Sequence, residues 1–133
     1  MSGISKYLIV VTGPTASGKT DLAIQLAQHF QTEIINADSR QCYRELKIGV
    51  AAPSAEQLAA VPHHFIQSHS IHETVTAATF EQYALQVLER LFVTHNVVVL
   101  TGGTGLYIKA LCEGMDAIPV SYTHLTLPTK RIV

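Results

Sequence analysis

The chain has 133 residues, of which 47% are hydrophobic and 14% are charged, and its formal net charge is −1. This composition excludes disordered, collagen-like and coiled-coil chains, and it predicts one domain with a buried core. The near-neutral charge argues against a domain that holds nucleic acid by charge alone. It still allows a nucleic-acid substrate that is held mostly by another part of a longer protein.

The alternation of apolar, β-branched runs with segments of helical periodicity predicts the fold class. The expected elements, in chain order, are a strand over 7–11, a helix whose apolar face extends from Leu22 to Phe30, a strand over 33–37, a short helix over 54–60, a helix from Thr76 or Thr79 to Phe92, a strand over 97–100 and a helix over 106–113. Strands that alternate with helices predict an α/β fold, a parallel β-sheet flanked by helices with right-handed crossovers.

Residues 121–133 differ from the rest of the chain in their pattern of apolar and polar residues, which has no helical period and only a weak strand alternation. Such a segment is typical of an exposed tail or an edge strand. We therefore divide the chain into a core, residues 1–120, and a tail that does not belong to it, residues 121–133. On this basis we expect deletion of the tail to change the free energy of unfolding by no more than about 0.5 kcal/mol.

Neither a membrane span nor a secretory signal is expected. No apolar run approaches the roughly 20 residues that a spanning helix needs, and the N-terminus lacks the long apolar region of a signal peptide. Cys42 and Cys112 are the only cysteines in the sequence. In a core-forming chain they indicate buried thiols in a reducing compartment, so we expect a cytoplasmic protein with no membrane partner.

A glycine-rich loop between the first strand and the first helix fits the pattern G-x-x-x-x-G-K-[ST]. Its backbone amides and the positive end of the following helix would face an anion, and Lys19 would add a charge. The Thr20 hydroxyl is placed to ligate Mg²⁺. The pattern predicts a polyphosphate site without specifying ATP; the alternative is a plain glycine-rich turn. The candidate diphosphate- or nucleotide-binding residues are Gly13, Pro14, Thr15, Ala16, Ser17, Gly18, Lys19 and Thr20.

Two polar residues follow other strands of the expected sheet. Many phosphate-loop ATPases carry a magnesium-binding Asp after a buried strand, but here the strand 97–100 leads into Thr-Gly-Gly. The candidate acid is instead Asp38, because the carboxyl ends of parallel strands meet beside the loop. Thr104 can face the same crevice. The alternatives are a turn or helix-capping aspartate for Asp38, and a hydroxyl that caps the last helix for Thr104.

A cluster of four histidines admits a structural zinc site: His63, His64, His69 and His72. Neither cysteine is near them in the sequence, and the stretch is expected to be irregular. We therefore favour solvated or substrate-facing loop histidines over zinc ligands.

Four further segments follow the phosphate loop in a specific order: Asp38-Ser39-Arg40-Gln41-Cys42-Tyr43-Arg44, Ile48-Gly49, Pro62-His63-His64 and Gly102-Gly103-Thr104-Gly105-Leu106-Tyr107. With this order and spacing, residues 5–119 resemble the tRNA dimethylallyltransferases, also called tRNA isopentenyltransferases. The phosphate loop alone is generic, whereas the first and last of these segments together are specific.

The resemblance implies a phosphate-loop (P-loop) NTPase fold of the nucleotide-kinase type. It implies transfer of a dimethylallyl group from dimethylallyl diphosphate, with Mg²⁺ beside it, to the exocyclic amine of the adenine 3′ to the anticodon in tRNA. Asp38 would take the proton of that amine, and Thr104 would contact the reacting centre. The implied tRNA-binding residues are Asp38, Ser39, Arg40, Gln41 and Thr104.

Two departures from the family pattern matter. Ala52 stands where the family usually has a Lys, and family members are much longer, with further basic residues in the remainder. We therefore expect this chain alone to have little or no activity. Without the remainder, an open sheet edge and an uncovered apolar face predict that it self-associates or is only marginally stable. Two other functions stay open: an ATP-dependent small-molecule kinase, and a non-catalytic domain that only binds diphosphate.

Overall fold

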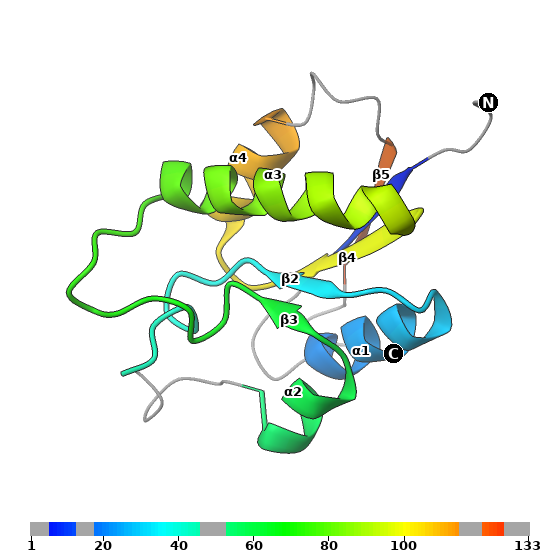
Figure 1. The fold of residues 1–133 in the computed structure, drawn as a ribbon, viewed down its shortest axis with the longest axis horizontal. Coiled ribbons are helices and arrows are strands. Elements are labelled where there is room, and N and C mark those ends of the chain that lie inside the picture. Colours follow the sequence, from blue (N-terminus) through cyan, green and yellow to red (C-terminus); the bar gives the residue numbers. More distant parts are fainter. Residues whose placement is uncertain (1–5, 13–17, 46–52, 115–120, 127–133) are drawn as a thin grey trace.

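A computed structural model describes residues 6–12, 18–45, 53–114 and 121–126, the last range for its backbone alone. The elements are β1 (Tyr7–Thr12), α1 (Lys19–His29), β2 (Ile34–Asn36), α2 (Ala55–Ala60), β3 (His63–His64), α3 (Ala77–Thr94), β4 (Val97–Thr101), α4 (Gly105–Gly114) and β5 (Ser121–Thr126). The strands form one parallel sheet in the order β3-β2-β4-β1-β5 (Figure 1). This is the α/β fold that the sequence predicts.

The central strands end in register at the carboxyl edge of the sheet. Val11 of β1 pairs with Thr101 of β4, and Thr101 pairs with Asn36 of β2. The Thr101 hydroxyl also donates to the Val11 carbonyl oxygen at 3.1 Å. The chain segments that follow these three strands therefore leave the sheet side by side at the same edge.

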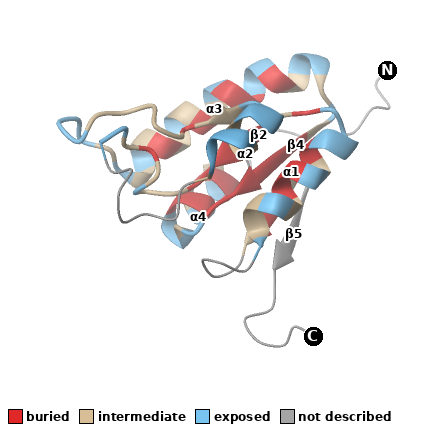
Figure 2. Cartoon of the chain, turned by 90° about the horizontal axis from the view of Figure 1, so that it is seen from below, coloured by how far each residue is buried: buried red, intermediate tan, exposed pale blue. Residues whose placement is uncertain are grey.

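Helices cover both faces of the sheet, with α1 and α2 on one side and α3 and α4 on the other (Figure 1). Side chains alternate between the faces along each strand, so Ile34 and Val99 pack with α1, whereas Ile35 and Leu100 pack with α3 and α4. Figure 2 shows the buried residues in the sheet and on the helix sides that face it. Because both faces are covered, the strands read as continuous apolar runs in the sequence.

Local signals place the beginnings of two helices. Ser54 caps α2, and its side chain and that of Gln57 bond reciprocally to each other's backbone N–H. Of the two threonines that could begin α3, Thr76 is the cap, with Thr79 as its reciprocal partner. One expectation for α1 is wrong: Phe30 lies just beyond the end of the helix and is 41% exposed.

Two strands lie outside the strands expected from the apolar runs. The stretch around His63 is expected to be irregular, but its residues His63 and His64 form the strand β3, which pairs with β2. Strand β5 pairs with β1 over its whole length, from Ser121 to Thr126. Of the two interpretations of this segment, edge strand and exposed tail, the structure has the edge strand.

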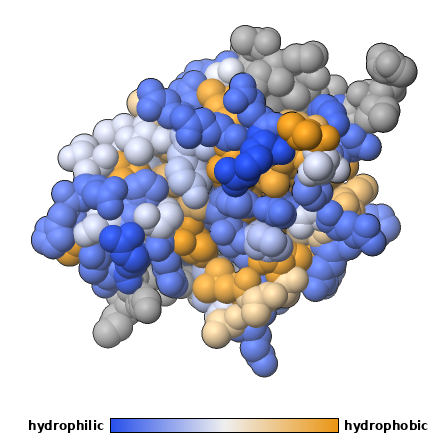
Figure 3. Space-filling model, viewed as in Figure 1, coloured by the Kyte–Doolittle hydropathy of each residue, from blue (hydrophilic) through white to orange (hydrophobic). Residues whose placement is uncertain are grey.

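Large apolar side chains are exposed on separate elements rather than on one. They are Tyr7, Phe30, Ile71, Val93 and Leu106. On the face shown in Figure 3, hydrophobic residues are interspersed with hydrophilic ones. Within the part of the chain that the structure describes, no helix combines the length and hydrophobicity needed to cross a bilayer.

Candidate active site

The segments after β2 and β4 are joined main chain to main chain. The Ala37 N–H donates to the Thr101 carbonyl oxygen at 2.6 Å, and the Thr104 N–H donates to the Ala37 carbonyl oxygen at 3.1 Å. Gly102 lies between these contacts with φ 156°, and a Cβ built on it would be 2.2 Å from the Ala37 oxygen. Only glycine permits this approach, so Gly102 fixes the turn before α4 against the end of β2.

Thr104 connects this turn to the segment after β2 through its side chain. Its hydroxyl oxygen accepts a hydrogen bond from the Ser39 N–H at 2.9 Å and lies 3.3 Å from the Ser39 hydroxyl, to which it can donate. The main-chain carbonyl of Thr104, rather than the hydroxyl, receives the first N–H groups of α4, from Tyr107 and Ile108. The structure thus brings Thr104 and Ser39 together at the carboxyl edge of the sheet.

The two carboxylate oxygens of Asp38 have different surroundings. Oδ1 accepts hydrogen bonds from the Arg40 N–H at 2.8 Å and the Gln41 N–H at 3.0 Å. This is an Asx turn. The alternative that Asp38 is a turn aspartate is therefore correct for Oδ1. Oδ2 lies on the side of the β4–α4 turn, 3.7 Å from the position that a Cβ on Gly103 would occupy.

Lys19 reaches the same place from the first residue of α1. Its Nζ atom lies 3.5 Å from that Cβ position on Gly103. A positive and a negative side chain from distant parts of the sequence therefore flank one exposed glycine at the carboxyl edge of the sheet. Both side chains end within 4 Å of the same point, and the pair combines a positive charge that suits an anion with an oxygen that can accept a proton.

The helix after the phosphate loop begins at Lys19, close to Gly18 as the sequence predicts. Gly18, the cap of α1, has φ 87°, a left-handed conformation that suits glycine. Thr20 lies in the first turn of α1, where its hydroxyl is near the positive end of the helix dipole. Five of the candidate residues lie outside the described residues: Gly13, Pro14, Thr15, Ala16 and Ser17. Ala52 also lies outside them.

Segment 41–44 is held by a partner that the sequence analysis missed, the turn after β3. The Gln67 N–H donates to the Gln41 carbonyl oxygen at 2.9 Å, and the His69 N–H donates to that of Cys42 at 2.9 Å. The Arg44 N–H donates to the His69 carbonyl oxygen, also at 2.9 Å. These contacts involve the main chain alone and leave no pattern of residue types in the sequence.

Cys42 is not a nucleophile in this setting. Its side chain is fully buried, and its thiol lies 3.6 Å from the Ser39 carbonyl oxygen. Burial, and then the nearby charge of Asp38, raise the pKa of Cys42 to about 11. The thiol therefore stays protonated at neutral pH and serves as a small core residue.

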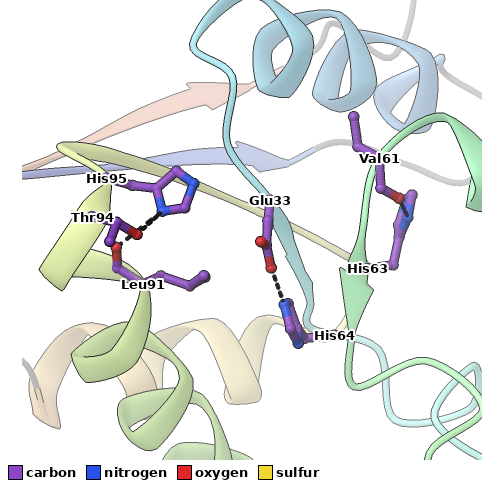
Figure 4. Close-up of polar contacts among 7 residues, drawn as sticks. All are labelled: Glu33, Val61, His63, His64, Leu91, Thr94 and His95. Carbon is purple, nitrogen blue, oxygen red and sulfur yellow. Dashed lines mark hydrogen bonds and ion pairs between the residues drawn. The ribbon is translucent and has the colours of Figure 1, made fainter.

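The histidines have separate local partners. His63 Nδ1 lies 2.9 Å from the Val61 carbonyl oxygen, and His64 pairs with Glu33 at 2.6 Å (Figure 4). His69 Nδ1 contacts the Ser68 hydroxyl at 2.7 Å. His95, also drawn there, contacts Leu91 and Thr94 on α3. Across the described ranges, no three His, Cys, Asp or Glu side chains converge as metal ligands, and His64 is bound to Glu33 rather than solvated.

Comparisons with known proteins identify the family of this chain. A family model described as IPP transferase matches residues 41–130. The tRNA dimethylallyltransferase of Cytophaga hutchinsonii is 56% identical over 131 residues, which are 98% of this chain and 43% of that protein. The enzyme of the same name from Christiangramia forsetii is 53% identical over 116 residues, which are 87% of this chain and 38% of that protein.

A solved structure supports the fold. The tRNA isopentenylpyrophosphate transferase of Bacillus halodurans superposes with a TM-score of 0.78 at 35% identity, covering 84% of this chain and 37% of that one. The chain thus spans about two fifths of the length of the curated relatives it matches.

The match to the family model extends past residue 120. It therefore does not mark the division between core and tail, which stays a prediction. Since the family model covers more than half of its residues, this chain belongs to the IPP transferase family and has that family's P-loop NTPase-like fold.

Proposed function

We propose that this sequence supplies the catalytic half of a tRNA dimethylallyltransferase. One observation carries the proposal: Lys19 and Asp38 flank Gly103, beside Thr104, at the carboxyl edge of the sheet in a chain of the IPP transferase family. Relatives with 56% and 53% identity bear the name tRNA dimethylallyltransferase. The substrates would be dimethylallyl diphosphate and the adenine 3′ to the anticodon, and the setting would be the cytoplasm, where both cysteines stay free.

The chemistry follows from the two charged side chains. Residues Gly13 to Thr20 would hold the diphosphate, with Lys19 and the start of α1 neutralising its charge. The adenine amine attacks the prenyl carbon, a C–N bond forms, and the C–O bond breaks as diphosphate leaves with the electron pair. Asp38 accepts the amine proton through Oδ2, because Oδ1 already accepts two backbone hydrogen bonds. Thr104 contacts the reacting centre.

A magnesium ion fits the residue types at this place. Mg²⁺ prefers oxygen ligands and usually takes one or two from the protein, with water and substrate phosphate oxygens completing the shell. Thr20, in the first turn of α1, offers a hydroxyl oxygen of this kind. When bound, the ion would supply positive charge that stabilises the leaving diphosphate.

The tRNA would contact the strip after β2. Asp38 to Gln41 would hold the flipped-out adenine, and Thr104 would border it. The Arg40 side chain is exposed and the other residues are partly so, which leaves the strip accessible to a base that has left its stack. The charges that hold the rest of the anticodon arm would lie in the part of the relatives that this chain does not span.

Prenyl transfer tests the proposal directly. The chain is joined at residue 120 to the C-terminal remainder of the Cytophaga hutchinsonii relative and is assayed on an unmodified anticodon stem-loop with Mg²⁺. We expect transfer by the joined protein and little or none by the 133-residue chain.

Two substitutions in the joined protein separate the roles of the charged side chains. Asp38→Asn should lower kcat by roughly 10²–10⁴-fold, the usual contribution of general base catalysis, while diphosphate binding changes little. Lys19→Ala should instead weaken diphosphate binding measured by calorimetry.

Two other results would replace the proposal, and a third would change the role of Asp38. Phosphorylation of a metabolite by ATP, with no prenyl transfer, would favour the kinase. Diphosphate binding without any transfer by the joined protein would favour a non-catalytic domain. Near-normal turnover of Asp38→Asn would restrict Asp38 to its Asx turn.

A further inference from the structure

The turn after β3 contains two non-glycine residues with left-handed backbone, Phe65 with φ 65° and Gln67 with φ 51°. A bulky side chain rarely adopts this conformation, and it persists only where the surroundings enforce it. The Phe65 side chain is fully buried. Its ring lies 5.0 Å, between centroids, from each of the rings of His69, Phe80 and Tyr83.

This turn contacts the last residue of the proposed tRNA strip, Gln41, and the residues directly after it, 42–44. The N–H groups of Gln67 and His69 donate to the carbonyl oxygens of Gln41 and Cys42, and Tyr43 forms an isolated bridge with His69. In Figure 1 the chain after β3 lies beside the segment that follows β2. The unusual backbone at Phe65 and Gln67 is thus the feature that turns these amides toward the strip.

The two ends of segment 38–44 have different partners outside the segment, although the Gln41 N–H bond to Asp38 also links them to each other. Asp38 and Ser39 are fixed by their own Asx turn and by Thr104. Residues 41–44 are fixed by the turn after β3, which the buried ring of Phe65 anchors to α3. A change at Phe65 should therefore act first on residues 41–44, while Asp38 keeps its bond from the Arg40 N–H and Ser39 keeps its bond to Thr104.

We propose that Phe65 is a positioning residue for RNA binding, acting through the backbone of Gln67 and His69 on residues 41–44. The inference rests on the proposed function of the strip. It assigns to Phe65 an effect on the KM for the RNA, whereas Asp38 and Thr104 act on kcat.

The experiment compares Phe65→Leu with Leu88→Ala in the joined protein. Leu88 is a buried, non-aromatic residue of α3 in the same core cluster as Phe65, so its truncation controls for a general loss of core packing. We expect Phe65→Leu to raise the KM for the stem-loop about tenfold, because small displacements of a positioning group have effects of this order or larger. Its kcat and its affinity for diphosphate should stay within about threefold, and Leu88→Ala should leave all three within that range.

Amide hydrogen exchange on the 133-residue chain separates this inference from the proposed function. In Phe65→Leu, the amides of Arg44, Gln67 and His69 should exchange at least about tenfold faster than in the parent, while that of Thr104 keeps its protection. Unchanged exchange at the three amides overturns the inference, as does an unchanged KM in an active joined protein. An inactive parent protein counts against the proposed function alone, and exchange then decides the inference. If Phe65→Leu does not fold, Phe65→Met replaces it; failure of both to fold makes Phe65 a general core residue and overturns the inference.

Discussion

The centre of the sheet and its edges are built differently. Strands β1, β4 and β2 are covered on both faces and end in register, and the close approach of Gly102 to Ala37 links the ends of β4 and β2. Strand β3 has two residues, and β5 pairs with β1 alone. The centre therefore determines where the candidate active-site residues lie, whereas the edges complete the sheet around it.

Gly102→Ala should disrupt the turn between β4 and α4 and cause the largest loss in the free energy of unfolding. A Cβ at this position would lie 2.2 Å from the Ala37 carbonyl oxygen and 2.5 Å from its carbon, all backbone atoms. The turn must move, at an expected cost of about 3 kcal/mol or more in the free energy of unfolding. Urea denaturation followed by circular dichroism measures it.

Gly105→Ala is the matched control, because nothing lies within 4 Å of the Cβ it would add. It should leave stability unchanged or raise it by up to about 1 kcal/mol, since alanine favours a helix. Equal effects of the two substitutions would show that the turn adapts and that the close approach does not fix the site.

The same contrast explains what the sequence could predict. Buried parallel strands leave long apolar runs, so the central strands and the residues at their ends, Asp38 and Thr104, could be identified from the sequence. The turn at Phe65 could not, because its contacts with residues 41–44 are backbone hydrogen bonds that any residue type can make. The position of Lys19 beside Gly103 depends on α1 packing across the sheet, which only the three-dimensional structure shows.

Removal of residues 121–133 tests the outer edge. The sequence alone predicts a change within about 0.5 kcal/mol, but the structure pairs β5 with β1 along six residues. Deletion would leave the β1 edge open, so we now expect a loss of about 1–3 kcal/mol, the sum of a few backbone hydrogen bonds. Open strand edges also favour pairing between chains, so the truncated chain should self-associate more strongly in sedimentation experiments.

A shorter deletion, of residues 127–133, serves as the control because it keeps β5. It should be nearly neutral if β5 provides the stability of the edge. If the full deletion also changes stability by less than about 0.5 kcal/mol, β5 contributes nothing to the fold and the division at residue 120 gains support.

The smallest effect is expected at the opposite edge, from His63 in β3. His63 Nδ1 must carry a proton to donate to the Val61 carbonyl, and Nε2 is buried without a hydrogen-bond partner. Burial lowers the pKa of His63 below its usual value of 6.5. The Val61 contact opposes this shift, and the neighbouring His64 adds to it.

Between the lowered pKa and 6.5 the unfolded chain binds more protons than the folded one, so the stability of the fold should fall as the pH drops below 6.5. The slope should stay below the ~1.4 kcal/mol per pH unit of one complete proton, because His63 is only partly buried. His63→Gln cannot titrate, so the difference between parent and variant in denaturant unfolding, from pH 7.5 to 5.5, isolates this residue from the carboxylates that both chains share. Parallel pH profiles of the two chains would show that the edge at β3 opens freely enough to hydrate His63 in the folded protein.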